Sequence, residues 1–106
     1  MSFTDTDEAF RAKVNIRLYV DRHKSIRAAM NELEYVLSEE FGVGEGGVKV
    51  REMKISKRLP DSFTVLIKSL QSINLQEVER RAEDALVREL SYDRDSTSAS
   101  VIDTVP

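Results

Sequence analysis

The hydrophobic pattern changes its period between residues 13 and 41, and this change restricts the fold more than any other feature of the sequence. Over residues 13–20 apolar and polar side chains alternate, which is typical of a strand buried on one face only. Over residues 26–41 the apolar side chains recur every three or four positions, which is typical of an amphipathic helix. The sequence therefore predicts a strand followed by a helix that packs on it. The core-facing residues predicted for the strand are Val14, Ile16, Leu18 and Val20.

Two residues mark the ends of the predicted helix. Ser25 is suited to the N-cap because its hydroxyl can accept a hydrogen bond from a first-turn amide, and Gly42 is suited to the left-handed position after the last turn. The glycine-rich stretch at 42–47 is expected to be a flexible connector. A second strand is predicted at 48–56, where a one-residue slip in the alternation indicates a bulge near Arg51 and Glu52. The inward residues predicted for that strand are Val48, Val50, Met53 and Ile55.

The rest of the sequence predicts a turn, a third strand and a second helix. Residues 57–62 are predicted to form a hairpin turn around Pro60, and 62–70 a third strand with Phe63, Val65 and Ile67 inward. Asn74 is an expected N-cap for a second amphipathic helix. Its apolar stripe is Leu75, Val78, Ala82, Ala85, Leu86 and Leu90.

The predicted order is β-α-β-β-α, closed by a short final strand at 99–105. This is the split β-α-β pattern of ferredoxin-like sandwiches, an α+β class with two helices on one face of an antiparallel sheet. We expect one domain over residues 12–92, preceded by an acidic arm at 1–11 and followed by a tail or short edge strand at 93–106. The pattern is shared by many unrelated proteins and carries no function by itself.

Composition excludes several classes of function. The 106 residues include no cysteine, which excludes disulfides and thiolate catalysis, and one histidine, which argues against a structural zinc site. No apolar run reaches the length of a bilayer span, and the acidic N-terminus is unlike a signal peptide, so a cytoplasmic location is expected. The net charge of −3 is too small to make the whole chain a polycation.

The distribution of charge is more informative than its sum. Strand residues that alternate with the core set must lie on the sheet face that the helices leave open. A second basic cluster is expected where the end of the first strand and the hairpin turn meet. Together these predict a site for an anionic partner, formed by Lys13, Arg17, Tyr19, Lys49, Lys54 and Lys68 on the face, and by Arg22, His23, Lys24, Arg27, Lys57 and Arg58 at the loops.

No motif indicates catalysis, a metal or a cofactor. Asp21, His23 and Ser25 are the residue types of a catalytic triad, but residues two apart at a strand-helix junction do not converge in that geometry. The glycine-rich stretch runs from helix to strand, whereas phosphate-binding loops run from strand to helix. Glu39 and Glu40 lack the spacing of a calcium loop. We therefore expect a protein that is not an enzyme and uses no cofactor.

Two functions fit these observations. The first is a small binding module that uses the basic face and loops to hold an anionic partner, with nucleic acid favoured over an acidic protein surface. The paired aromatics of an RNA-recognition motif are absent from its strands. The second is an assembly or adaptor subunit that forms oligomers or docks a partner through an edge strand or the open face, including Tyr19 and Leu66. Basic strand residues also serve simply to keep sheets soluble.

Overall fold

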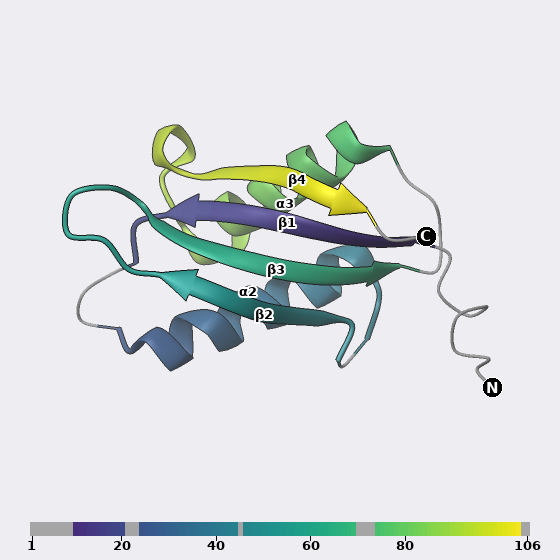
Figure 1. Ribbon diagram of the computed structural model, residues 1–106, viewed down its shortest axis with the longest axis horizontal. Helices are drawn as coiled ribbons and strands as arrows, with labels where there is room; N and C mark the ends of the chain where they lie inside the picture. Colours follow the sequence, from purple (N-terminus) through teal and green to yellow (C-terminus); the bar gives the residue numbers. More distant parts are fainter. Residues whose placement is uncertain (1–9, 21–23, 45, 70–73, 105–106) are drawn as a thin grey trace.

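The computed structural model describes residues 10–20, 24–44, 46–69 and 74–104. These residues form a four-stranded sheet, two long helices and one short 3-10 helix (Figure 1). Their bounds lie within three residues of those predicted, and the final strand is present. In chain order the elements are β1 (Phe10–Leu18), α2 (Ile26–Phe41), β2 (Val48–Lys54), β3 (Asp61–Ser69), α3 (Leu75–Leu90), η1 (Arg94–Ser96) and β4 (Ser98–Thr104).

The sheet has the strand order β2-β3-β1-β4, and all three strand pairs are antiparallel. Both helices lie behind the sheet in Figure 1, so one sheet face is covered and the other is open. The predicted α+β class with two helices on an antiparallel sheet is therefore confirmed. The β2–β3 hairpin loop, the end of β1 and the start of α2 all lie at the left end of the molecule in this view.

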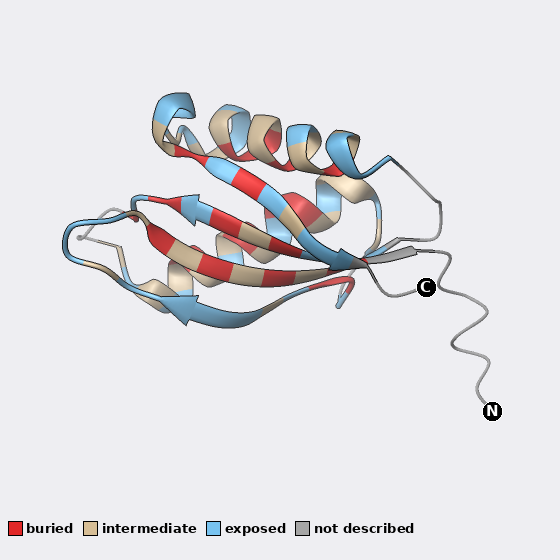
Figure 2. Ribbon diagram, turned by 45° about the horizontal axis from the view of Figure 1, so that its top comes forward, coloured by how far each residue is buried: buried red, intermediate tan, exposed pale blue. Residues whose placement is uncertain are grey.

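The core lies between the sheet and the helices. Val14, Ile16, Leu18 and Val20 are all buried, as predicted, and the register sets Ile16 opposite Phe63. Figure 2 shows buried and more accessible positions alternating along the central strands. Full burial of a large apolar side chain contributes about 1.5–3 kcal/mol, so these central strands hold the fold together. The helices supply Ala29, Leu33, Leu37, Val78, Ala82 and Leu86.

The predicted helix ends are confirmed. The Ser25 hydroxyl accepts a hydrogen bond from the Ala28 amide at 3.1 Å, and Gly42 ends α2 with φ of 62°. The Asn74 side chain accepts from the Gln76 amide at 2.8 Å. These bonds satisfy amides that the first helical turns leave without partners.

At the end of the α2–β2 connector, Gly47 is held by two backbone hydrogen bonds. The Gly47 amide donates to the Gly44 carbonyl at 3.1 Å, and the Gly47 carbonyl accepts from the Lys68 amide at 2.8 Å. A Cβ atom on Gly47 would lie 2.4 Å from the side chain of Val43. Glycine is required at position 47 because of this close approach.

Strand β2 contains both a confirmed and a wrong prediction. Its register against β3 shifts between Val50 and Glu52, which is the predicted bulge. Met53 and Ile55 were expected to point into the core, but they are 46% and 44% exposed. Met53 faces the core residue Phe63 across the ladder. Since β2 is an edge strand, no further strand shields its outer side, and Figure 2 shows its second half as exposed.

Candidate binding surface

The strand register arranges four basic residues in two rows across the open face. Lys13 and Lys49 both lie opposite Leu66, one on each side of β3. Arg17 and Lys54 both lie opposite Ser62. The rows are four residues apart along β3, a separation of about 13 Å at the usual rise of a strand. All four basic residues are exposed, and Lys68 is exposed on β3.

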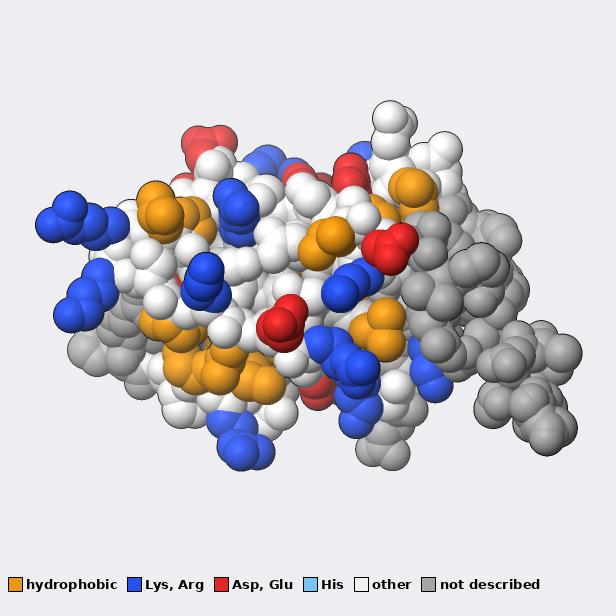
Figure 3. All heavy atoms as spheres, in the orientation of Figure 1, with side chains coloured by type: hydrophobic (Ala, Val, Ile, Leu, Met, Phe, Trp, Pro, Cys, Tyr) orange, Lys and Arg blue, Asp and Glu red, His pale blue; other side chains and the backbone are white. Residues whose placement is uncertain are grey.

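The open face is not uniformly basic. Glu52 lies opposite Thr64, and Asp103 lies opposite Lys13, so two acids share the face with the cations. Figure 3 views this face and shows acidic side chains among the basic ones, with several hydrophobic groups between them. Glu52 reaches the face because of the bulge in β2, and Asp103 because β4 pairs with β1. The sequence-based assignment of the face left both acids out.

A groove is hollowed into the open face beside the hairpin. It has a volume of about 490 Å³. Arg17 and Lys54 lie at its polar side together with Ser62, while Ile55, Leu59 and Pro60 supply apolar walls. Tyr19 is 48% exposed and follows Arg17 on the same alternating face of the chain. The groove therefore combines positive charge with apolar surface.

The predicted loop cluster is only partly described. Arg22 and His23 lie outside the described residues. The Lys24 ammonium donates to the Glu32 carboxylate at 2.6 Å, so its charge is already matched within the chain. Arg27, Lys57 and Arg58 are exposed, and their segments lie at the same end of the sheet (Figure 1).

The four face cations differ from Lys24 in having no ion-pair partner among the described residues, although Asp103 lies opposite Lys13. Within the part of the chain that the structure describes, Lys13, Arg17, Lys49 and Lys54 form no ion pair. A cation without an internal carboxylate can be neutralised by an external anion without first breaking a native contact. This favours the two rows over Lys24 as a place where an anionic ligand would bind.

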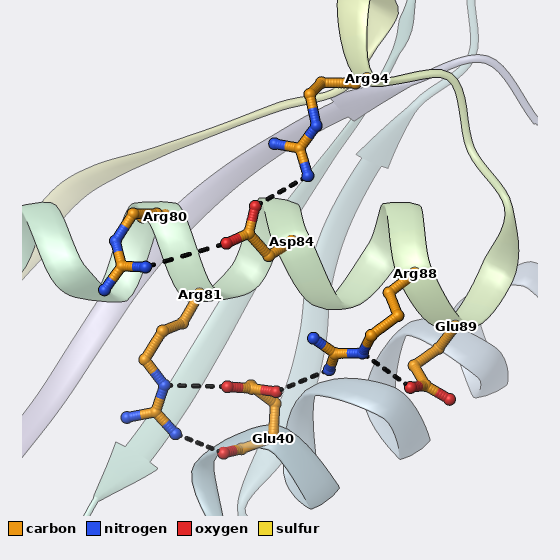
Figure 4. A network of polar contacts seen from close by, with 7 residues as sticks. All are labelled: Glu40, Arg80, Arg81, Asp84, Arg88, Glu89 and Arg94. Carbon is orange, nitrogen blue, oxygen red and sulfur yellow. Dashed lines mark hydrogen bonds and ion pairs between the residues drawn. The ribbon is translucent and has the colours of Figure 1, made fainter.

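In the helix layer, by contrast, arginines and carboxylates are paired with each other (Figure 4). The Glu40 carboxylate at the end of α2 accepts from Arg81 at 2.9 Å and from Arg88 at 3.0 Å, both on α3. Burial raises the pKa of Glu40, but the hydrogen bonds and charges of the two arginines outweigh it, and the net pKa lies below its ordinary value. The Arg81 guanidinium also lies 4.9 Å from the centre of the Phe41 ring. Glu40 therefore links the end of α2 to α3 through two ion pairs.

Asp61 has a structural role that sequence reasoning missed. It is fully buried, and its carboxylate accepts from the Val20 amide at 3.1 Å and the Ser56 amide at 3.0 Å. These bonds join the end of β1 to both ends of the hairpin loop. The pattern Pro60-Asp61 indicated a turn, but no local signal indicated the bond to Val20, which is 41 residues away.

The described residues include neither a cluster of metal-ligating side chains nor a helix able to span a membrane. In the described ranges no three His, Cys, Asp or Glu side chains gather in a group suited to a metal ion. Neither of the long helices is apolar enough, over enough residues, to cross a bilayer. Comparisons with protein-family models, curated proteins and solved structures found no match to this chain.

Proposed function

We propose that this protein is a non-enzymatic binding module whose open sheet face holds an anionic partner, with single-stranded nucleic acid favoured. We also propose that its fold is of the ferredoxin-like type, an assignment that the strand order β2-β3-β1-β4 supports. The cytoplasmic location expected from the sequence stays a prediction.

The observation that carries the proposal is the pairing of Arg17 and Lys54 across Ser62 at the groove. Both cations lack an internal carboxylate partner in the described chain, and they are exposed. Phosphate contacts by such residues supply most of the affinity in sequence-independent nucleic-acid binding. The groove therefore has the charge needed to hold a phosphate backbone.

Single strands are favoured over duplexes because apolar and aromatic groups lie beside the cations. Ile55 and Leu59 line the groove, and Tyr19 is exposed on the same face. Unpaired bases stack on aromatic side chains and contact apolar surface, whereas bases in a duplex are already stacked on each other. Glu52 and Asp103 interrupt the positive charge, so we expect modest affinity.

The test is fluorescence anisotropy of labelled mixed-sequence RNA and DNA single strands, titrated with the protein at several salt concentrations. The double variant R17Q/K54Q should lower affinity at least several-fold. Its salt slope should fall by about 1.4, because each phosphate contact contributes about 0.7 for a single strand.

The control is R80Q/R88Q, which removes two cations from the helix layer and changes net charge equally. It should leave affinity and salt slope near those of the unaltered protein. Equal losses in both variants would mean that binding follows net charge rather than the groove. No detectable binding of either nucleic acid at low salt would refute the proposal.

A second candidate is an assembly role for the same face. The exposed Tyr19, Ile55 and Leu59 form apolar surface that association would cover. Light scattering at rising protein concentration tests this candidate. A dimer or larger species that Tyr19→Glu or Leu66→Glu dissociates would support it, and a monomer at all concentrations would exclude self-assembly.

A further inference from the structure

The two edges of the sheet differ in how their backbone groups are covered. On β4, the Ala99 amide donates to the Glu83 carboxylate at 3.0 Å, and the Val101 amide donates to Glu79 at 2.8 Å. Both glutamates project from α3. Since these amides belong to the outermost strand, α3 blocks strand addition at Ala99 and Val101.

The β2 edge is covered only at its beginning. The Val50 amide donates to the Glu34 carboxylate of α2 at 2.9 Å. Beyond the bulge, no hydrogen bond from outside the sheet reaches residues 51–54 within the described chain, and all four residues are exposed. Half of the outer edge of β2 is therefore uncovered.

The register shows which groups point outward there. Val50 directs its amide away from β3, as its bond to Glu34 requires. Val50 faces Val65, and Met53 faces Phe63, which is two residues from Val65 on the same strand. Alternate residues of a strand direct their backbone groups to the same side, so Met53, like Val50, directs its amide and carbonyl outward. Met53 thus offers the donor and acceptor that an added strand needs.

The side chains around this edge favour one kind of occupant. Lys49, Arg51 and Lys54 lie along β2 with one acid, Glu52, and Lys57 and Arg58 follow in the hairpin loop, so cations outnumber acids at this edge. This positive charge would repel the same edge of a second copy and attract an acidic segment. Met53, Ile55 and Leu59 are exposed beside it and give apolar contacts for alternate side chains.

We propose that the outer edge of β2, from Arg51 to Ile55, docks an extended acidic peptide of another protein by strand addition. The peptide pairs through the Met53 backbone, and its acidic residues alternate with apolar ones so that each finds a matching neighbour on β2. This inference goes beyond the proposed function, because it adds the edge backbone of β2 as a recognition element, although Lys54, Ile55 and Leu59 are shared with the groove.

The test uses the full chain, labelled with ¹⁵N, and a synthetic peptide of alternating Glu and Val. Peptide binding should slow hydrogen exchange at the Met53 amide and concentrate the spectral changes at residues 51–55. A peptide of the same length with Lys in place of Glu should bind at least tenfold more weakly. The proposal is overturned if the Met53 amide exchanges at the same rate with and without the acidic peptide.

Two further experiments distinguish backbone pairing of the peptide from simple charge attraction to β2. Met53→Pro removes the outward amide at a position where an edge strand tolerates proline, and it should weaken peptide binding at least tenfold. Met53→Ala keeps the amide and should bind within a few-fold of the unaltered protein. A peptide with alternate backbone nitrogens methylated gives the same information without altering the protein, and undiminished binding of this peptide would refute strand addition.

The outcome is independent of the nucleic-acid proposal. R17Q/K54Q tests the open face with oligonucleotides, whereas Met53→Pro tests the edge with peptide. Loss of oligonucleotide binding in R17Q/K54Q but not in Met53→Pro would support two separate surfaces. If an oligonucleotide protects the Met53 amide and the acidic peptide does not, the edge belongs to the nucleic-acid site and the peptide proposal is wrong.

Discussion

The helix layer and the open sheet face both carry many charges, but they use them differently. On the helices, Arg81 and Arg88 share the carboxylate of Glu40, while Arg80 and Arg94 contact Asp84 (Figure 4). On the sheet, the two rows of cations face Leu66 and Ser62 across the ladder, and no acid neutralises them within the described chain. Charge on the helices is therefore paired within the fold, while the four sheet cations form no ion pair in the described chain.

The way side chains meet between two helices differs from the way they meet across a sheet, and this explains why the two layers pair their charges differently. The end of α2 lies against α3, so one carboxylate reaches two arginines that are seven residues apart on the same helix face. Across an antiparallel sheet, each side chain meets whatever residue lies directly opposite. Here β3 offers a leucine and a serine to the cations, and an acid lies opposite only at Lys13, which faces Asp103 on β4.

The largest expected effect comes from Asp61, a fully buried carboxylate. Asp61→Ala leaves the buried Val20 amide and the partly buried Ser56 amide without their acceptor and should destabilise the protein by about 3 kcal/mol. Urea denaturation followed by circular dichroism measures this loss. Asp95→Ala, at an exposed carboxylate of η1, is the control and should change stability by no more than about 0.5 kcal/mol. A loss below 1 kcal/mol in Asp61→Ala, on the order of a surface change, would contradict the role given to Asp61.

A smaller effect is expected at the junction of the helices. Glu40→Gln removes the charge that both arginines contact and should cost about 1 kcal/mol at neutral pH. Since the pKa of Glu40 in the folded protein lies below its ordinary value of 4.5, this charge stabilises the fold above pH 4.5. The stabilisation is lost as pH falls through the lower, folded-state pKa.

Thermal denaturation between pH 7 and pH 3 tests this dependence. The difference between the unaltered protein and Glu40→Gln should shrink toward zero at the acid end. Glu39→Gln, at the exposed neighbouring residue, should show a small difference at every pH. A difference for Glu40→Gln that grows on acidification would be incompatible with the lowered pKa.

The third effect is weaker because the ion pairs concerned are more accessible to water. Asp84→Asn weakens contacts with Arg80 at 3.9 Å and Arg94 at 2.9 Å and should cost about 0.5 kcal/mol at low salt. High salt should remove most of that difference. Denaturation at two salt concentrations measures it, and a loss unaffected by salt would indicate a role other than ion pairing.

The smallest effect on stability is expected at the open face. R17Q/K54Q should change the free energy of unfolding by no more than about 0.5 kcal/mol in either direction, because neither residue has an internal ion pair to lose. Denaturation of R17Q/K54Q and of Glu40→Gln under the same conditions compares their free energies of unfolding directly. A clear destabilisation would place Arg17 or Lys54 in the structural framework and remove the contrast between the layers.

The sequence predicted the elements well because their signals are local. The alternation around Ile16, the stripe around Leu33 and the caps at Ser25 and Asn74 each depend on residues a few positions apart. The predicted bulge in β2 also came from a local slip in the pattern.

The surface was harder to predict because it depends on neighbours that are distant in sequence. Met53 has an inward register, but its position on an edge strand leaves it exposed. Glu52 and Asp103 join the open face only through the bulge and the β1–β4 pairing. The pairing of Lys24 with Glu32, eight residues later, likewise depends on where the chain enters α2.

The unequal edges of the sheet also limit how far this protein can polymerise. Fibre growth by strand addition needs two open edges on each copy, one to accept the next copy and one to be accepted by it. The glutamates of α3 occupy the Ala99 and Val101 amides of β4, so a strand added at β2 would not find a matching open site there in the next copy. If the β2 edge recruits a partner as proposed, these two bonds oppose growth into a fibre of the protein's own copies.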